Sequence, residues 1–379
     1  MRRCWLIEGS IVVALLAAAA VAWGGVGAGR DPGVDRIIAA ARTEAHGAEY
    51  ARYLAGEIGP RLTGSAKLAR AEKWARDRLN SLGLDVRLES WGKFDPAKEL
   101  GRNTSRGTRG PRTVHNVIAE LRGTEKPDEF VIVGAHLDSW VFAHGATDNA
   151  AGCGAVMEAA RILVASGVKP KRSIRFVLWT GEEQGLLGSK AFATAHAGEM
   201  TKTSAVFVMD AGTNPVAGLT ATHAMRADLE RVFAPVAMLD AEHPFALTFT
   251  DGLALPADCC TKPAQPSLAT CTGGTAACSA LSAAGSCPSD HTPFLQAGVP
   301  AFLFEQRGPA DYARTHHTEF DTVDALVPSA VEHSALVIAL AAYGVAELPG
   351  LLAREKLVAP VNAGAGPLMA PQACTPGCE

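Results

Sequence analysis

Imidazole and carboxylate side chains follow several short apolar runs in the central part of the chain, where they could bind a metal ion. They are His136, Asp138, Asp148, Glu182, Glu183, Asp210 and His317. Imidazole nitrogens and carboxylate oxygens are the ligands that zinc prefers when thiolates are absent. Any one of these residues alone would more simply cap a helix or form a turn. Taken together, they predict a site for two zinc ions with a carboxylate that bridges them.

Two close pairs within this set suggest a division of roles. His136 and Asp138 are two residues apart on an extended segment, so their side chains can point to the same side. The Asp138 carboxylate could then bind the second ring nitrogen of His136 and fix the orientation of the ring. Glu182 and Glu183 are neighbours at the end of an apolar run and face different ways. One of them can therefore bind metal while the other transfers protons.

Alternating strand-like and helix-like segments are predicted to position these side chains. The apolar runs typical of buried strands lie at 130–135, 174–180, 205–210 and 299–305. The helix-like stretches lie at 154–165, 186–195 and 330–345. This alternation predicts an α/β fold with a mixed, largely parallel central sheet and helices on both faces. Because ligands collect beyond the carboxyl ends of the strands in such a sheet, the candidate ligands should lie close together.

The first 28 residues have the pattern of an export signal. Arg2 and Arg3 precede an apolar run of about 13 residues at 11–23, and small residues follow. A helix needs roughly 20 residues to span a bilayer, which favours a cleaved signal over an uncleaved anchor and predicts no stable membrane span after cleavage. The paired arginines also fit a twin-arginine signal. We therefore expect a secreted or periplasmic protein.

The rest of the chain is interpreted as one domain with a loop insertion and a tail. Residues 29–112 are expected to form a helical segment and a connecting loop of this domain, with two or three helices at 34–82. Residues 113–349 form the predicted catalytic core, and 350–379 are the tail. The stretch 256–288 inside the core is rich in cysteine, proline, alanine and threonine, which indicates an inserted loop.

The chain has nine cysteines, and their distribution suggests disulfides. Those of the inserted loop are Cys259, Cys260, Cys271, Cys278 and Cys287. Export favours disulfides among them, and a zinc site made only of cysteines is the alternative. Cys374 and Cys378 could close a small loop in the tail, whereas Cys153 lies in a helix of small residues and is expected to be packed. The sequence leaves the pairing open.

The charge of the chain bears on its partners. Its 35 basic and 39 acidic side chains are mixed along the sequence and give a formal charge of -4. A protein that binds nucleic acid usually gathers its basic side chains in a patch or stripe, so nucleic acid is not an expected partner. The oligomeric state is left open.

The segment from 132 to 192 resembles the M28 family of di-zinc peptidases, which includes aminopeptidases and secreted glutamate carboxypeptidases. It contains the signatures His-x-Asp, Gly-Ala-x-Asp-Asn and Glu-Glu-x-Gly-x-x-Gly-Ser in the order of the family. The resemblance runs from about residue 115 to 345, and several stretches are similar to the plasma glutamate carboxypeptidase branch. Asp290 and His291 also match a family motif, for which a supporting or structural role is implied. The implied fold is the phosphorylase/hydrolase-like fold of zinc exopeptidases.

The resemblance implies a role for each metal ligand. His136 and Asp210 would bind one zinc ion, and Glu183 and His317 would bind the other. Asp148 would bridge the two ions. The cofactor is therefore expected to be zinc, two ions per chain, and the substrate a peptide.

The same resemblance implies the catalytic and substrate-binding groups. Glu182 would be the general base that takes a proton from a zinc-activated water. His317 is chosen over His316 because it directly precedes the threonine of the family motif, and His316 and Asn149 are candidate substrate contacts. Family members also tend to have a cis peptide bond after the bridging aspartate, which here joins Asp148 to Asn149.

Two departures from the family leave the specificity open. The chain has no room between residues 86 and 115 for the protease-associated domain that many relatives insert, and the cysteine-rich loop lies where the family shapes its substrate pocket. We predict an exported zinc aminopeptidase. A dipeptidase or carboxypeptidase of the same family is the alternative. A glutaminyl cyclase-like acyltransferase with one zinc ion, and a binding protein without catalysis, are the rivals from other classes.

Overall fold

The structure is a computed structural model, and it describes residues 31–99, 110–239, 241–253 and 288–357. The predicted signal at 1–28, the five cysteines of the inserted loop and the two of the tail lie outside these residues. The expected export signal and disulfides therefore stay predictions.

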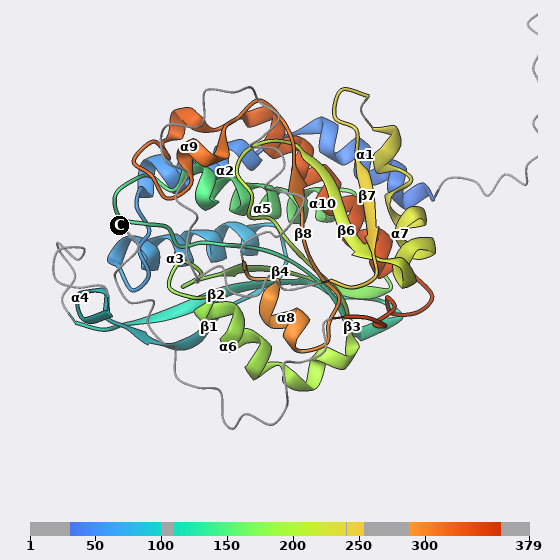
Figure 1. The fold of residues 1–379 in the computed structure, drawn as a ribbon, viewed down its shortest axis with the longest axis horizontal. Coiled ribbons are helices and arrows are strands. Elements are labelled where there is room, and N and C mark those ends of the chain that lie inside the picture. Colours follow the sequence, from blue (N-terminus) through green and yellow to red (C-terminus); the bar gives the residue numbers. More distant parts are fainter. Residues whose placement is uncertain (1–30, 100–109, 240, 254–287, 358–379) are drawn as a thin grey trace, which may run out of the picture. The chain divides into compact units, whose positions relative to one another are not determined.

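A central sheet of six strands, in the order β1-β2-β4-β3-β5-β8, forms the middle layer (Figure 1). The strands are β1 (Asp85–Phe94), β2 (Arg112–Leu121), β3 (Lys126–His136), β4 (Arg172–Trp179), β5 (Thr203–Val208) and β8 (Ala301–Leu303). β3 pairs in parallel with β4 and β5, and β5 with β8, whereas β1 and β2 add an antiparallel edge. Every residue of β4 is buried, as in a strand covered on both faces. The predicted α/β class is confirmed.

Helices cover both faces of this sheet. α1 (Pro32–Thr43), α2 (Gly47–Arg52), α3 (Ala66–Ser81), α5 (Ala151–Ala165) and α10 (Pro328–Ala346) form one layer. α6 (Leu187–Ala195) and α8 (Thr292–Gln296) lie on the opposite face (Figure 1). The remaining short elements are η1 (Tyr53–Ile58), α4 (Pro96–Glu99), η3 (Ala146–Ala150), η4 (Ala197–Lys202), η5 (His223–Met225), η6 (Val236–Met238), α9 (Tyr312–Thr315) and η7 (Val323–Ala325).

The N-terminal helices share the hydrophobic core of the sheet. Ile37 of α1, Leu54 of η1 and Leu68 of α3 belong to the same cluster of buried side chains as the strands. α3 begins at a regular cap, because the Ser65 side chain accepts a hydrogen bond from the Leu68 main-chain N–H at 3.0 Å. This arrangement anchors the segment before α3, at residues 59–65, beside the sheet.

A second, three-stranded sheet was not predicted from the sequence. It consists of β7 (Ala246–Thr250), β6 (Val216–Thr222) and β9 (Glu305–Gln306), and α7 (Arg226–Phe233) connects β6 to the segment before β7. The strand predicted at 299–305 is divided between the two sheets, because β8 ends at Leu303 and β9 begins two residues later.

The start of α5 is packed closely against the end of β5. A Cβ atom on Gly152 would lie only 2.5 Å from the main-chain oxygen of Met209, so a larger residue would push helix and strand apart. This close approach brings the segment before α5, which carries Asp148, next to Asp210 at the end of β5.

Among the described residues, one helix has the length and apolar composition of a membrane span. It is α10, and 72% of its most apolar window is buried inside the fold, against α5 and the strands β3, β4 and β5. The burial is that of a core helix.

Candidate metal centre

The structure brings all five predicted metal ligands together at the carboxyl edge of the central sheet. His136 is the last residue of β3, Glu183 lies in the turn after β4, and Asp210 follows β5. Asp148 lies in η3, and His317 comes two residues after α9. His136, Glu183 and Asp210 thus meet at strand ends, as the argument from the parallel sheet predicts, and Asp148 and His317 join them from other segments.

One half of the centre is formed around the His136 ring. The His136 Nε2 atom lies 3.0 Å from Asp148 Oδ1 and 3.2 Å from Asp210 Oδ1. All three side chains are nearly buried, with 1% of His136, 5% of Asp148 and 10% of Asp210 exposed.

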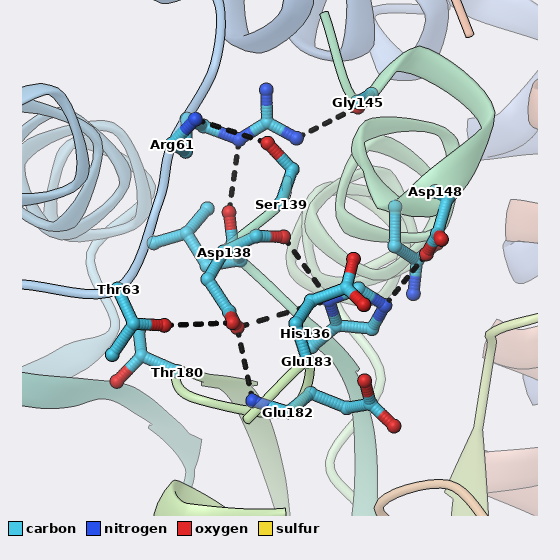
Figure 2. Close-up of polar contacts among 12 residues, drawn as sticks. Arg61, Thr63, His136, Asp138, Ser139, Gly145, Asp148, Thr180, Glu182 and Glu183 are labelled. Atoms are coloured by element: carbon cyan, nitrogen blue, oxygen red, sulfur yellow. Dashed lines mark hydrogen bonds and ion pairs between the residues drawn. The ribbon is translucent and has the colours of Figure 1, made fainter. Parts of the chain in front are cut away.

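The other half is formed around the His317 ring. The His317 Nε2 atom lies 3.0 Å from Glu183 Oε2 and 3.4 Å from Asp148 Oδ2. Asp148 thus turns one carboxylate oxygen toward each half, which is the arrangement that a bridging ligand requires. Figure 2 shows Asp148 beside His136, with the Glu183 carboxylate on the same side of the ring.

The donor set fits a divalent cation. Two groups, one of His136, Asp148 and Glu183 and one of Asp148, His316 and His317, each offer ligand atoms that lie within 4.8 Å of one another. Two ligands of a tetrahedral zinc ion lie roughly 3.3 Å apart, and the contacts within each half are of that size. The Oε1 atom of Glu183 is buried without a hydrogen-bond partner among the described residues. A cation would satisfy this oxygen.

Electrostatics favours a cation at the same place. Burial, with the nearby Asp148 charge added, raises the pKa of Glu183 well above its usual range. Burial likewise raises the pKa of Glu182, and the Asp210 charge adds to the effect. The pKa of Asp210 is lowered: burial alone would raise it, but the His136 ring outweighs that effect. Crowded carboxylates of this kind ionise together only when a positive charge offsets their repulsion.

The neighbouring histidines differ in their geometry. The His316 Nε2 atom lies 4.0 Å from Asp148 Oδ2, farther away than that of His317, and the two rings stack with their centroids 3.8 Å apart. The two side chains are similarly exposed, His316 at 42% and His317 at 46%, so only the distances distinguish them. His317 therefore has the better geometry for a ligand, and His316 remains placed to meet a substrate.

Asp138 connects the centre to Glu182, but its contacts differ from those predicted. The His136 Nδ1–H donates to the main-chain oxygen of Asp138 at 3.1 Å, while the Asp138 carboxylate lies 3.8 Å away. The carboxylate instead accepts hydrogen bonds from the Thr63 hydroxyl at 2.9 Å and from the Glu182 main-chain N–H at 3.2 Å (Figure 2). The prediction that this carboxylate binds the ring nitrogen is corrected accordingly.

Thr63 was not recognised from the sequence, and we expect it to hold Asp138 in place. Replacing it by valine keeps the shape of the side chain but leaves the fully buried Asp138 carboxylate with one donor fewer. Loss of such a supporting group typically costs 10- to 100-fold in metal affinity or activity, and we expect kcat/KM to fall by roughly tenfold. Steady-state kinetics and metal titration of Thr63→Val measure the effect. Thr63→Ser, which keeps the hydroxyl, is the matched control; a Val variant with wild-type kinetics would exclude the role.

Arg61 is a second unpredicted residue, and it lies fully buried behind the centre. Its guanidinium donates to the main-chain oxygens of Leu54, Gly59, Leu137, His144 and Gly145. The negative charges of Asp138, Asp148 and Asp321 partly offset the cost of burying the Arg61 guanidinium. Arg61 therefore ties η1 to the loop that leads from β3 to Asp148.

Two further polar residues support the ligands. The Asp321 carboxylate accepts hydrogen bonds from the main-chain N–H groups of Ala146 at 3.0 Å, Thr147 at 2.6 Å and Asp148 at 3.1 Å. The Ser289 hydroxyl donates to Asp210 Oδ2 at 2.6 Å. Nothing in the residue pattern itself shows which groups these two residues contact.

Asn149 is not placed to contact a substrate, contrary to the expectation. It is fully buried, its Nδ2 donates to the Met209 main-chain oxygen at 2.8 Å, and its Oδ1 accepts from the Gly152 N–H at 3.0 Å. The predicted cis peptide bond between Asp148 and Asn149 is present.

The other residues singled out from the sequence are buried beside the centre. Asp290 is fully buried, which raises its pKa to about 7, and burial lowers the pKa of His291 to about 4. Cys153 is also buried, as predicted; its Sγ–H donates to the His136 main-chain oxygen, and burial raises the pKa of the thiol to about 12. A thiol in this state is unreactive.

Comparison with known proteins identifies a family. Residues 116–253 and 260–342 match the sequence model of peptidase family M28. A curated relative, carboxypeptidase Q of Rattus norvegicus, is 29% identical over 276 residues, which cover 69% of this chain and 50% of the relative. The chain thus spans about half the length of the curated relatives that it matches.

Solved structures share the fold. An M28 peptidase precursor from Shewanella amazonensis matches with a TM-score of 0.64 at 21% identity, over 84% of this chain and 97% of the other. A zinc aminopeptidase from Bacillus subtilis matches with a TM-score of 0.56 at 17% identity, over 79% and 94%. Glutaminyl cyclase from Fimbriiglobus ruber matches with a TM-score of 0.53 at 20% identity, over 79% and 94%. The fold alone therefore does not distinguish a peptidase from a cyclase.

Proposed function

Since the chain belongs to peptidase family M28, we propose that it is a zinc-dependent exopeptidase that removes residues from the amino end of peptides. The observation that carries this proposal is the position of Asp148, whose two carboxylate oxygens face the two halves of the centre. A centre with one ion would not need a carboxylate shared in this way.

In this proposal two zinc ions are held by the residues already described. His136 and Asp210 would bind one ion, Glu183 and His317 the other, and Asp148 both. When bound, zinc polarises the scissile carbonyl and lowers the pKa of a water molecule toward roughly 7. The surrounding carboxylates balance the charge of the cations.

Glu182 would supply the proton transfer. Its main-chain N–H donates to the Asp138 carboxylate, which fixes Glu182 beside the centre. Glu182 would take the proton of the attacking water and return it to the departing amine. His316, exposed beside His317, would face the substrate.

Metal removal tests the metal dependence of this proposal. We expect dialysis against a chelator to abolish hydrolysis of unblocked dipeptides, and zinc to restore it, because in this proposal zinc polarises the carbonyl. Metal analysis of the purified protein should approach two zinc ions per chain. Full activity in metal-free protein would rule out the metallopeptidase. A peptide with N-terminal glutamine, assayed together with metal analysis, distinguishes the peptidase from its two rivals. A cyclase would convert this peptide and bind one ion. A non-catalytic binding protein would turn over neither this peptide nor the dipeptides.

A carboxypeptidase or dipeptidase is the second candidate, because the curated relatives are named carboxypeptidase Q. A panel of dipeptides with one blocked terminus separates the candidates. An aminopeptidase fails on substrates with a blocked amino group and tolerates a blocked carboxylate, a carboxypeptidase does the reverse, and a dipeptidase fails on both.

A further inference from the structure

The turn between β4 and α6 carries both Glu182 and Glu183, the base and a metal ligand of the proposed function. The later part of this turn is closed by main-chain hydrogen bonds. The Glu182 oxygen accepts from the N–H groups of Gly185 at 2.8 Å and of Leu186 at 2.9 Å. The first residue of the turn, Thr180, is held in another way, by side chains that come from neighbouring strands.

Thr180 is fully buried, and its hydroxyl joins it to two other strands. An indole N–H can only donate, so the Trp91 Nε1–H donates to Thr180 Oγ1 at 2.8 Å. The Thr180 hydroxyl in turn donates to the main-chain oxygen of His115 at 3.0 Å. The Thr180 main-chain N–H donates to Asn116 Oδ1 at 3.2 Å. Because Trp91 belongs to β1 and the other two partners belong to β2, the start of the turn is tied to both strands of the antiparallel edge.

Trp91 reaches Thr180 from a point where β1 is irregular. The pairing of β1 with β2 passes from Ser90 directly to Gly92, so Trp91 is the extra residue of a β-bulge. A bulge changes the direction of a side chain from the regular alternation of the strand, and bulges are common beside active sites. The indole here spans β2, which lies between β1 and β4, and meets the residue that follows β4.

The indole ring also touches the turn itself. Gly181 has a left-handed conformation with a φ of 78°, which favours glycine. A Cβ atom at this position would lie 3.1 Å from Trp91 Cζ2 and 3.0 Å from Leu187 Cβ. The ring therefore packs against the point at which the main chain leaves the strand and turns toward Glu182.

The acceptor of the Thr180 hydroxyl is itself fixed by Glu72 of α3. One oxygen of the Glu72 carboxylate accepts from the His115 main-chain N–H at 3.1 Å, and the other lies 2.9 Å from His115 Nδ1. The Glu72 side chain is only 4% exposed. Contacts thus run from α3 through β2 to Thr180, which anchors the start of the turn in the body of the fold.

We propose that Trp91 is a positioning residue: through the Thr180 hydroxyl it fixes the direction in which the turn presents the carboxylates of Glu182 and Glu183. A displacement of about 1 Å at a reacting group can cost about 10²-fold in rate. A hydrogen bond that orients the turn therefore acts on catalysis and on metal binding, although it touches neither substrate nor metal. The catalytic part of this inference rests on the proposed exopeptidase function, whereas the effect on metal affinity does not depend on catalysis.

The kinetic test removes the partners of this hydrogen bond one at a time. Trp91→Phe keeps a ring but lacks the N–H, and Thr180→Val lacks the hydroxyl. We expect each change to lower kcat for unblocked dipeptides roughly tenfold and to leave KM within about twofold, because neither side chain contacts the substrate. Thr180→Ser, which keeps the hydroxyl, should restore kcat. The double variant Trp91→Phe/Thr180→Val should be no slower than Thr180→Val alone, since both changes remove the same hydrogen bond.

Trp74→Phe is the matched control, because Trp74 of α3 is also partly buried and stacks on Tyr53 at 4.6 Å. It should leave kcat unchanged and unfold in urea at about the same midpoint as Trp91→Phe. If Trp91→Phe does not fold, the comparison of Thr180→Val with Thr180→Ser carries the same test. Wild-type kcat in Trp91→Phe, a loss that is confined to KM, or additive losses in the double variant would overturn the positioning role.

A second readout needs no catalysis. Competition with a chelator measures the dissociation constant of the more weakly bound zinc ion. Trp91→Phe and Thr180→Val should raise this constant about tenfold through the displaced Glu183 carboxylate, and Thr180→Ser and Trp74→Phe should leave it unchanged. If no peptide is cleaved but zinc affinity follows this pattern, the positioning role stands and the exopeptidase function fails. If peptides are cleaved while neither kcat nor zinc affinity responds to Trp91→Phe, the exopeptidase function stands and the positioning role fails.

Discussion

Replacing Glu182 by glutamine should lower kcat by roughly 10²- to 10⁴-fold while the protein keeps its metal. Glutamine has the size of glutamate but cannot accept the proton of the attacking water at neutral pH. The hydrogen bond that positions this residue uses its main-chain N–H, which donates to Asp138 and is unaffected by the substitution. The expected loss of kcat would therefore come from the missing proton acceptor and not from a change in the fold.

Two further variants make this result interpretable. Glu183→Gln should lower both activity and zinc content, because Glu183 Oε2 lies 3.0 Å from His317 Nε2 inside the centre. Glu230→Gln, the same change on the exposed face of α7, should alter neither. Turnover by Glu182→Gln close to that of the wild type, with full zinc content, would show that another group acts as the base.

Replacing Arg61 by methionine should lower the free energy of unfolding by at least about 3 kcal/mol. The side chain is fully buried and donates to five main-chain oxygens, and methionine would remove all five hydrogen bonds. The oxygens of Leu54 and Gly145 would keep one main-chain donor each, and the other three would lose the donor that Arg61 supplies. A buried polar group without a partner costs roughly 1–3 kcal/mol, and the losses add only in part. Because a domain is stable by only about 5–15 kcal/mol, this is a large fraction of the total. Equilibrium unfolding in urea measures the change.

The control for Arg61 is the same substitution on the surface. Arg76→Met removes an exposed arginine of α3 that pairs with Asp77, and such pairs contribute about 0–1 kcal/mol. Arg61→Lys should be intermediate, since an ammonium group has fewer donors and no planar fork. If Arg61→Met and Arg76→Met unfold at the same urea concentration, the five hydrogen bonds of Arg61 make no net contribution to the free energy of unfolding.

The parts of the centre that sequence could predict are those with a local pattern. Buried strands such as β4 read as continuous apolar runs, and a polar residue directly after such a run lies at the carboxyl edge of a parallel sheet. His136, Glu183 and Asp210 could be recognised in this way. Asp148 and His317 do not directly follow a strand, and the resemblance to the family was needed to assign their roles.

The parts that sequence missed depend on contacts between distant segments. Thr63 is 75 residues away from Asp138, and Arg61 is 84 residues away from Gly145. The partners of Arg61 are main-chain oxygens, which every residue has, so no pattern of side chains in the sequence predicts these contacts. The strands β6 and β7 were missed because glycine, alanine and threonine separate their large apolar residues, and β7 is only partly covered, which leaves both with weak apolar periodicity.

The contacts of Thr63 and Asp321 also determine when activity can first appear during synthesis. Thr63 supports Asp138 from one end of the described chain, and Asp321 holds the Asp148 segment from near the other. At elongation rates of roughly 5–20 residues per second, more than about ten seconds separate the translation of these two residues. If the chain is the proposed peptidase, a nascent chain could therefore not cleave peptides until almost all of its folded part has been made. The proposed hydrolytic activity would in this sense belong to the finished molecule and not to any growing intermediate.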